Sequence, residues 1–150
     1  MRSRTGLLVA LLCVLTPVLP VRADMDLVVS DAWIREAPPG STVLAGYLKI
    51  TNRGTTQATV TGVSADDFSS VEIHRTIMEN GVARMLSARQ LEIPAGESFV
   101  LEPGGYHLML FNPVRPLVAG DTVELLLQIS NGACLAVNAP VARLAVDQHP

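Results

Sequence analysis

Hydrophobic and polar residues alternate along most of this chain in short runs, the pattern of β-strands that bury one face and expose the other. The runs are rich in Val, Leu, Ile and Thr, and none has the length and 3.6-residue period of an amphipathic helix. They predict strands at residues 27–30, 32–36, 43–51, 57–64, 70–78, 82–88, 98–102, 106–111, 122–129 and 133–138.

Turn-forming residues separate these runs, and Asn80-Gly81 is the clearest of them because this dipeptide favours a two-residue hairpin turn. No linker or internal repeat divides the chain, and 49% hydrophobic residues suffice for one core. Many short strands at this spacing predict one all-β domain, a β-sandwich or Greek-key barrel.

The first 23 residues have the features of a secretory signal peptide. Arg2 and Arg4 precede an apolar run at 6–15, and a plausible cleavage site lies before Asp24. Cys13 follows Leu12 rather than a small residue, so we expect no lipid or other permanent membrane anchor, although an uncleaved N-terminal anchor is the alternative. The sequence thus predicts an exported domain at 24–150 with a short unstructured tail at 145–150.

Charge and cysteine content narrow the function further. The whole chain has 11 basic and 14 acidic residues, and residues 1–23 contain three arginines and no acid, which leaves 8 basic residues against 14 acidic ones. This acidic balance argues against nucleic acid as a partner. Cys134 becomes the only cysteine, so we interpret it as a small hydrophobic residue on a strand rather than as a disulfide or redox site.

Strand alternation places several histidines and methionines on common faces. In residues 106–111, His107 and Met109 point to the side opposite to Leu108 and Leu110. In residues 71–76, His74 shares the outward face with Glu72 and Thr76. If Glu79 pairs with Val82 across the Asn80-Gly81 turn, Thr76 lies opposite Met85, and His74 follows on the same face.

His74, Met85, His107 and Met109 therefore form two outward pairs of soft, neutral ligands. Thioethers bind hard cations poorly and zinc prefers thiolate, imidazole and carboxylate, so this set favours Cu(I). Each residue taken alone has a simpler interpretation, since an isolated Met more often fills a gap and an isolated His more often makes a structural hydrogen bond.

The four residues follow the spacing His-x10-Met-x21-His-x-Met, and the chain resembles the periplasmic copper chaperones of the PCuAC family. The resemblance extends over roughly residues 31–137, with DAWIREAPPG, AGYLKITNRG, SVEIH, LEIPAGE, GGYHLML and RPLVAGDTVELLL. It implies a cupredoxin-like barrel that binds one Cu(I) at an exposed site through His74, Met85, His107 and Met109. It also implies a monomer that passes copper to an acceptor, such as a respiratory oxidase subunit or a thiol-containing assembly factor.

Two positions depart from the family pattern. Relatives often have additional methionines just after the first histidine, whereas this chain offers only Met78. Alternation places Met78 on the face of His74, where it could serve as a spare ligand, but we interpret it as a packing residue because it flanks a turn. Some relatives have His- and Met-rich C-terminal tails, whereas the tail here offers only His149, which we expect to be solvated.

Other functions remain open at this stage. A periplasmic copper buffer would share the same site. A blue-copper electron carrier needs a thiolate beside two histidines, and Cys134 is adjacent to no histidine. We expect no enzyme, because no nucleophile with a matched base and no open three-ligand metal motif is evident. A β-sandwich that binds no metal is the last alternative.

Overall fold

The computed structural model describes residues 26–143, and this part of the chain consists of strands and loops without a helix. The strands are β1 (Leu27–Arg35), β2 (Val43–Asn52), β3 (Ala58–Ser64), β4 (Phe68–Glu79), β5 (Val82–Ser87), β6 (Leu91–Ile93), β7 (Ser98–Leu101), β8 (Tyr106–Pro113), β9 (Thr122–Ile129) and β10 (Cys134–Ala142). No helix in residues 26–143 is long and apolar enough to span a membrane. The predicted signal peptide and the predicted tail at 145–150 lie outside the described residues.

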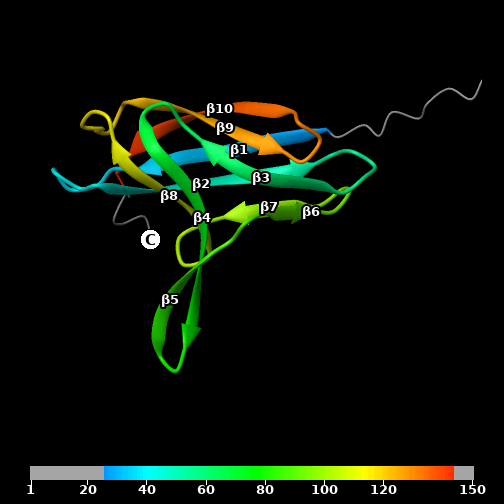
Figure 1. Ribbon diagram of the computed structural model, residues 1–150, viewed down its shortest axis with the longest axis horizontal. Coiled ribbons are helices and arrows are strands. Elements are labelled where there is room, and N and C mark those ends of the chain that lie inside the picture. Colours follow the sequence, from blue (N-terminus) through cyan, green and yellow to red (C-terminus); the bar gives the residue numbers. More distant parts are fainter. Residues whose placement is uncertain (1–25, 144–150) are drawn as a thin grey trace, which may run out of the picture.

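The strands form a β-sandwich whose two layers are visible in Figure 1. One layer contains β5, β4, β8, β2 and β1 in that order, with β7 also paired to β2, and the other contains β10, β9, β3 and β6. A short parallel pairing of β1 with β10 joins the layers. Side chains such as Ile34, Leu108, Leu110, Leu125 and Leu127 are fully buried between them. The predicted all-β, cupredoxin-like fold is confirmed.

The edge of β2 is shared by two successive strands, and this arrangement positions β8. The first half of β2 pairs with β8, up to Gly46 opposite Leu108, and its second half pairs with β7 from Leu48 opposite Leu101. Between these two pairings, the segment that connects β7 to β8 turns away from the edge of β2, and Gly104 in this turn has φ +83°. His107 therefore lies near the start of β8, next to the first residue that pairs with β2, and β4 runs along the other edge of β8.

Strands β4 and β5 form a hairpin that projects well beyond the sandwich (Figure 1). Its turn has positive φ at both central residues, 52° at Asn80 and 77° at Gly81, as a two-residue turn between twisted strands requires. Glu79 pairs with Val82 and Thr76 with Met85, which confirms the register predicted from the Asn-Gly dipeptide.

Three strand predictions need correction. The runs at 27–30 and 32–36 form one strand, β1, in which a bulge at Asp31 (φ 54°) shifts the register. The short strand β6 was not predicted, because three residues are too few for an alternating pattern. The last strand continues past residue 138, through Pro140, to Ala142.

Proline is tolerated in β10 because of its place in the ladder. The N–H of Val141 donates to the Asp121 carbonyl at 2.8 Å, so the nitrogen of Pro140 points to the opposite side of the strand. On that side, pairing with β1 begins only at Val141. No ladder hydrogen bond is lost at Pro140.

Asn52 is a fully buried polar residue at the end of β2. Its Nδ2 donates to the carbonyl oxygens of Thr56 (2.8 Å) and Ile93 (2.9 Å), and its Oδ1 accepts from the Gly54 N–H (3.0 Å). The side chain thus fixes the loop after β2 and joins it to β6. The sequence predicted a strand that ends at residue 51 and gave no sign of the hydrogen bonds of Asn52.

Candidate metal centre

The predicted ligands lie on the outer face of the β5-β4-β8 part of the sheet. His74 on β4 lies directly opposite His107 on β8, and the centroids of the two rings are 6.1 Å apart. Leu108 and Leu110 point to the other side, into the core. The expected alternation of β8 is therefore observed, and two imidazoles from distant parts of the chain become neighbours.

The two methionines flank this histidine pair. Met85 lies opposite Thr76, so it is a diagonal neighbour of His74 on the β5 side. Met109 lies opposite Glu72, so it is a diagonal neighbour of His74 on the β8 side and shares a face with His107. Diagonal neighbours on one face are about 7 to 8 Å apart, within reach of long side chains. The register thus places each methionine on the same sheet face as His74, as its diagonal neighbour on either side.

A backbone hydrogen bond determines which nitrogen His107 can offer. Its Nδ1 lies 3.1 Å from the carbonyl oxygen of Gly105. A carbonyl only accepts, so Nδ1 carries the proton and donates. In the neutral ring, Nε2 then holds the free lone pair. A backbone carbonyl is a common partner for the second nitrogen of a metal-binding histidine.

A carboxylate has the same role at His74. The Nε2 of His74 lies 2.8 Å from Oε2 of Glu72, and an ionised carboxylate only accepts, so Nε2 donates. This leaves the lone pair on Nδ1, which is buried and has no hydrogen-bond partner among the described residues. Buried polar atoms without a partner are rare, and an electropositive ligand such as a metal ion would satisfy this one.

Exposure increases across the site from β8 to β5. His107 is only 6% exposed, His74 and Met109 are half-buried, and Met85 is 60% exposed. Trp33 and Tyr47, with ring centroids 4.7 Å apart, occupy the same sheet face on the β2 side of β8. The exposed site that the family resemblance implies is therefore open at the β5 hairpin and closed at β8.

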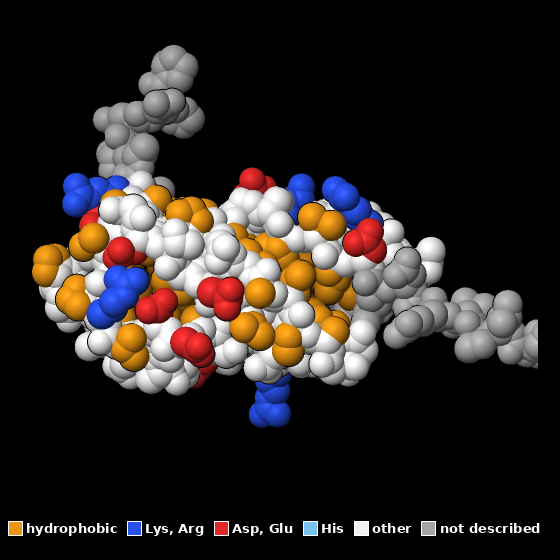
Figure 2. Space-filling view, turned by 90° about the horizontal axis from the view of Figure 1, so that it is seen from above, with side chains coloured by type: hydrophobic (Ala, Val, Ile, Leu, Met, Phe, Trp, Pro, Cys, Tyr) orange, Lys and Arg blue, Asp and Glu red, His pale blue; other side chains and the backbone are white. Residues whose placement is uncertain are grey.

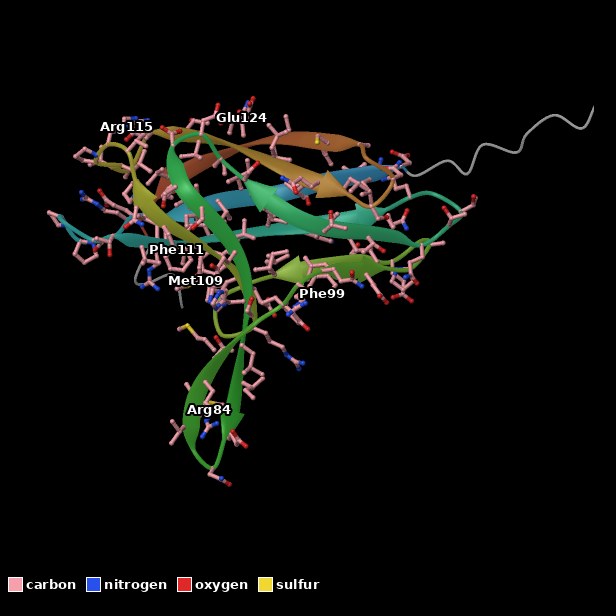
Figure 3. The ribbon with its side chains drawn as sticks, in the orientation of Figure 1. Arg84, Phe99, Met109, Phe111, Arg115 and Glu124 are labelled. Atoms are coloured by element: carbon pink, nitrogen blue, oxygen red, sulfur yellow. The ribbon has the colours of Figure 1, made fainter. Side chains whose placement is uncertain are left out.

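Figure 2 looks onto the sandwich from the end opposite to the hairpin, and it shows charged side chains scattered among hydrophobic ones and no histidine of the described residues on that face. In Figure 3, Met109 lies near the base of the hairpin, where β4 crosses β8, and Arg84 lies farther out on it.

Glu72 is the site residue whose role the sequence did not reveal. Alternation placed it on the outward face, two residues before His74, but gave no sign of the hydrogen bond between them. Within residues 26–143 no group of three or more His, Cys, Asp or Glu residues could hold a metal. The same sheet face offers the thioethers of Met85 and Met109 beside His74 and His107.

Cys134 does not belong to this site. It begins β10, in the other layer, opposite Gln128 of β9, and it is exposed. The strand position agrees with our interpretation, but the residue is at the surface. Strands β4 and β8 do not pair with β10, so the thiolate of a blue-copper centre has no place beside the two histidines.

The sequence matches one family of known proteins. Residues 27–141 match the family described as "Putative lipoprotein LpqE-like". A protein of Leifsonia xyli named "Putative lipoprotein Lxx21020" is 39% identical over 114 residues, which cover 75% of this chain and 68% of that protein.

Two solved structures have the same fold. A structure described as "Copper-bound PCuAC domain from PmoF2" superposes with a TM-score of 0.67 at 20% identity, covering 80% of this chain and 96% of that domain. The Cu(I) form of DR1885 from Deinococcus radiodurans superposes with a TM-score of 0.62 at 30% identity, covering 76% of each chain. The family match spans most of the described residues, and the chain therefore belongs to the LpqE-like family, which is the PCuAC-like family that its histidine and methionine spacing resembles.

Proposed function

We propose that this protein is an extracytoplasmic Cu(I)-binding metallochaperone whose ligands are His74, Met85, His107 and Met109. The observation that carries the proposal is the opposed histidine pair, in which hydrogen bonds to Glu72 and Gly105 leave one free nitrogen on each ring. The two similar structures named above are described as copper-bound and as a Cu(I) form, which supports copper as the cargo.

The donor set selects the oxidation state. Two imidazoles and two thioethers are neutral and soft, which suits Cu(I) and disfavours hard cations such as Mg²⁺ and Ca²⁺. Zinc sites are built from thiolate, imidazole and carboxylate, and this site offers no thiolate. Glu72 is held by His74, so we assign it the orientation of that ring rather than a place among the ligands.

The exposure gradient supports transfer by ligand exchange. Met85 lies on an edge strand and is 60% exposed, whereas His107 is buried. An incoming ligand of an acceptor can approach the metal from the Met85 side while the two histidines still hold it. Met85 would then leave first and His107 last.

The proposal includes the location of the protein and the acceptor of its copper. We propose a periplasmic protein, exported by the signal peptide at 1–23, that delivers copper to a respiratory oxidase copper centre directly or beside a thiol-containing assembly factor. The lipoprotein names of its relatives support an extracytoplasmic location.

A copper-buffering role would use the same site, and a strain that lacks the protein distinguishes buffering from delivery. Loss of oxidase activity that added copper restores supports delivery, and normal oxidase activity with altered copper tolerance supports buffering.

The test of the site is an anaerobic Cu(I) titration of residues 24–150 against a chromogenic competitor. We expect the wild type to bind one equivalent and His107→Ala and Met109→Ala to bind much more weakly. Met78→Ala is the control, because Met78 is a methionine on the same sheet face as His74 but is outside the proposed ligand set. Stoichiometric binding that survives both ligand substitutions would contradict the proposed site.

A further inference from the structure

The β4–β5 hairpin ends in an open strand edge. Strand β5 is the terminal strand of the sheet order, it pairs only with β4, and all six of its residues are exposed. Native proteins commonly protect such edges with proline, bulges or several charges. Residues 82–87 contain no proline, their register with β4 is unbroken, and Arg84 is their only charged residue.

The hydrogen-bond pattern shows which groups this edge offers. Glu79 and Val82 flank the two-residue turn, and the Ala88 N–H donates to the Ile73 carbonyl at 2.7 Å, so Val82, Arg84 and Leu86 direct their backbone groups toward β4. The intervening residues direct their N–H and C=O groups away from β4. These residues are Ala83, Met85 and Ser87.

The same hairpin concentrates exposed apolar side chains. Of the seven large hydrophobic residues that are strongly exposed in residues 26–143, four belong to it: Met78 (69%), Val82 (61%), Met85 (60%) and Leu86 (50%). Met78 and Met85 share the face of His74, whereas Val82 and Leu86 occupy the other face. A strand added beside β5 would cover apolar side chains on both faces.

Charge distinguishes the hairpin from the rest of the domain. Residues 74–89 contain three arginines (Arg75, Arg84 and Arg89) and one acid (Glu79), a net charge of +2. The other residues of the described range contain five basic and eleven acidic residues, a net charge of −6. A positive projection on a negative body attracts an acidic partner and orients it toward the hairpin.

We propose that β5 is the docking edge for the copper acceptor, which adds an extended acidic segment to it as a further strand. This inference rests on the proposed chaperone function. Strand addition uses backbone hydrogen bonds for affinity and alternate side chains for specificity. A residue of the acceptor opposite Met85 would have its Cβ about 4.5–5.5 Å from that of Met85, so its side chain could take the metal directly.

Two other occupants are less compatible with these observations. A second copy pairing β5 with β5 would place the positive hairpins together, which is unfavourable. An anionic lipid surface would match the arginines and the apolar side chains but would leave the outward N–H and C=O groups of β5 without partners.

The sharpest test removes one outward N–H. Ala83→Pro deletes a donor that the β4–β5 ladder does not use, whereas Ala83→Thr keeps the donor and favours a strand. The probe is the copper-free soluble domain of the oxidase subunit that carries the copper centre. Its binding to the protein is measured by calorimetry and by backbone amide shifts of the ¹⁵N-labelled protein.

We expect the largest shifts at residues 82–87, binding weakened at least about tenfold by Ala83→Pro, and little change with Ala83→Thr. The double substitution Arg84→Gln with Arg89→Gln should weaken binding and reduce its dependence on salt. Cu(I) titration of the same variants should match the wild type. This last measurement separates the two proposals, because a failed docking test with intact copper binding overturns only the docking edge.

Three results would overturn the docking proposal. The first is the absence of binding, or shifts away from β5, in a protein that still binds Cu(I). The second is concentration-dependent dimerisation that Ala83→Pro abolishes, which would assign the edge to a second copy. The third is binding to vesicles containing anionic phosphatidylglycerol without binding to the oxidase domain, which would assign the hairpin to a lipid surface.

Discussion

His74 and His107 form a directly opposed pair across β4 and β8, and their ring planes are tilted by 42°. The two residues are far apart in the sequence, so only the pairing of β4 with β8 brings them together. Each ring has one nitrogen held by a hydrogen bond to an acceptor, Glu72 or the Gly105 carbonyl. The pair is therefore oriented before any ligand arrives, which reduces the entropy lost on binding.

Because both rings would hold one ion, the effects of removing them should not be independent. We expect His74→Ala and His107→Ala each to weaken Cu(I) binding by about 100-fold or more. Removing a residue that only hydrogen-bonds to a metal ligand typically weakens metal binding by about 10–100-fold. The double variant should depart from additivity by more than about 0.5 kcal/mol, as groups that share an ion do. Competitor titrations of the four proteins measure this coupling, and strictly additive losses would show that the rings act at separate sites.

Glu72 should orient His74 without binding the metal itself. Glu72→Ala removes the acceptor for His74 Nε2–H, so we expect Cu(I) affinity to fall by about 10–100-fold. Glu72→Gln keeps an oxygen that can accept from His74, so its Cu(I) affinity should fall less than that of Glu72→Ala. The ¹⁵N shifts of the His74 ring in the metal-free protein should show Nε2 protonated in the wild type and a mixture of tautomers in Glu72→Ala.

Glu79→Ala is the matched control for Glu72, because Glu79 lies on the same strand and pairs with Arg84 instead of a histidine. Its substitution should leave both the His74 ring signals and the copper affinity unchanged. Tighter Cu(I) binding by Glu72→Ala would reverse the assignment and identify the carboxylate as a competitor for the ring.

Local patterns predicted the parts of this site that depend on neighbouring residues. Alternation placed His107 and Met109 on the face of β8 that points away from the core, whereas Leu108 points into it. The Asn80-Gly81 dipeptide fixed Met85 as the cross-strand partner of Thr76. Both results follow from geometry within one strand or one hairpin, where the side-chain period and the turn type determine the outcome.

Long-range pairing could not be predicted in the same way. The position of His74 opposite His107 depends on how β4 and β8 pack against the core, which their own sequences do not specify. The spacing of the four ligands supplied this information only through the family resemblance. The bulge at Asp31 and the three-residue strand β6 were missed for a similar reason, since tertiary contacts rather than local preferences determine them.

Asn52 should matter for stability rather than for metal binding. Asn52→Ala removes the donor to the part-buried carbonyl group of Thr56 and to the buried carbonyl group of Ile93, and an unsatisfied buried polar group costs about 1–3 kcal/mol. We therefore expect the free energy of unfolding to fall by at least about 2 kcal/mol in a denaturant titration.

The control for Asn52 is Asn131→Ala, because Asn131 is an exposed turn residue whose Oδ1 accepts from the Ala133 N–H at 2.9 Å. Loss of this exposed hydrogen bond should lower the free energy of unfolding by well under half as much as Asn52→Ala does. If Asn52→Ala and Asn131→Ala cost the same, burial would not explain the role of Asn52. Copper affinity should remain at the wild-type value in both variants.

The stability of the domain should decrease in acid because of Glu36 and Asp121. Hydrogen bonds from the Arg143 side chain and the Ala119 N–H lower the pKa of Glu36 below its ordinary 4.5. The Val118 N–H and Arg115 lower the pKa of Asp121 below its ordinary 3.8 in the same way.

A carboxyl group whose pKa is lower in the folded than in the unfolded state stabilises the fold above its ordinary pKa, and this contribution is lost as the pH falls through the lowered value. Glu36→Gln should therefore lower the melting temperature at pH 7, and the difference from the wild type should shrink as the pH falls below 4.5. Glu97→Gln, which also replaces an exposed glutamate by its amide, is the control and should leave the melting temperature at pH 7 unchanged. A Glu36→Gln deficit that stays constant from pH 7 to acid would mean that the side chain stabilises the fold through packing and not through its charge.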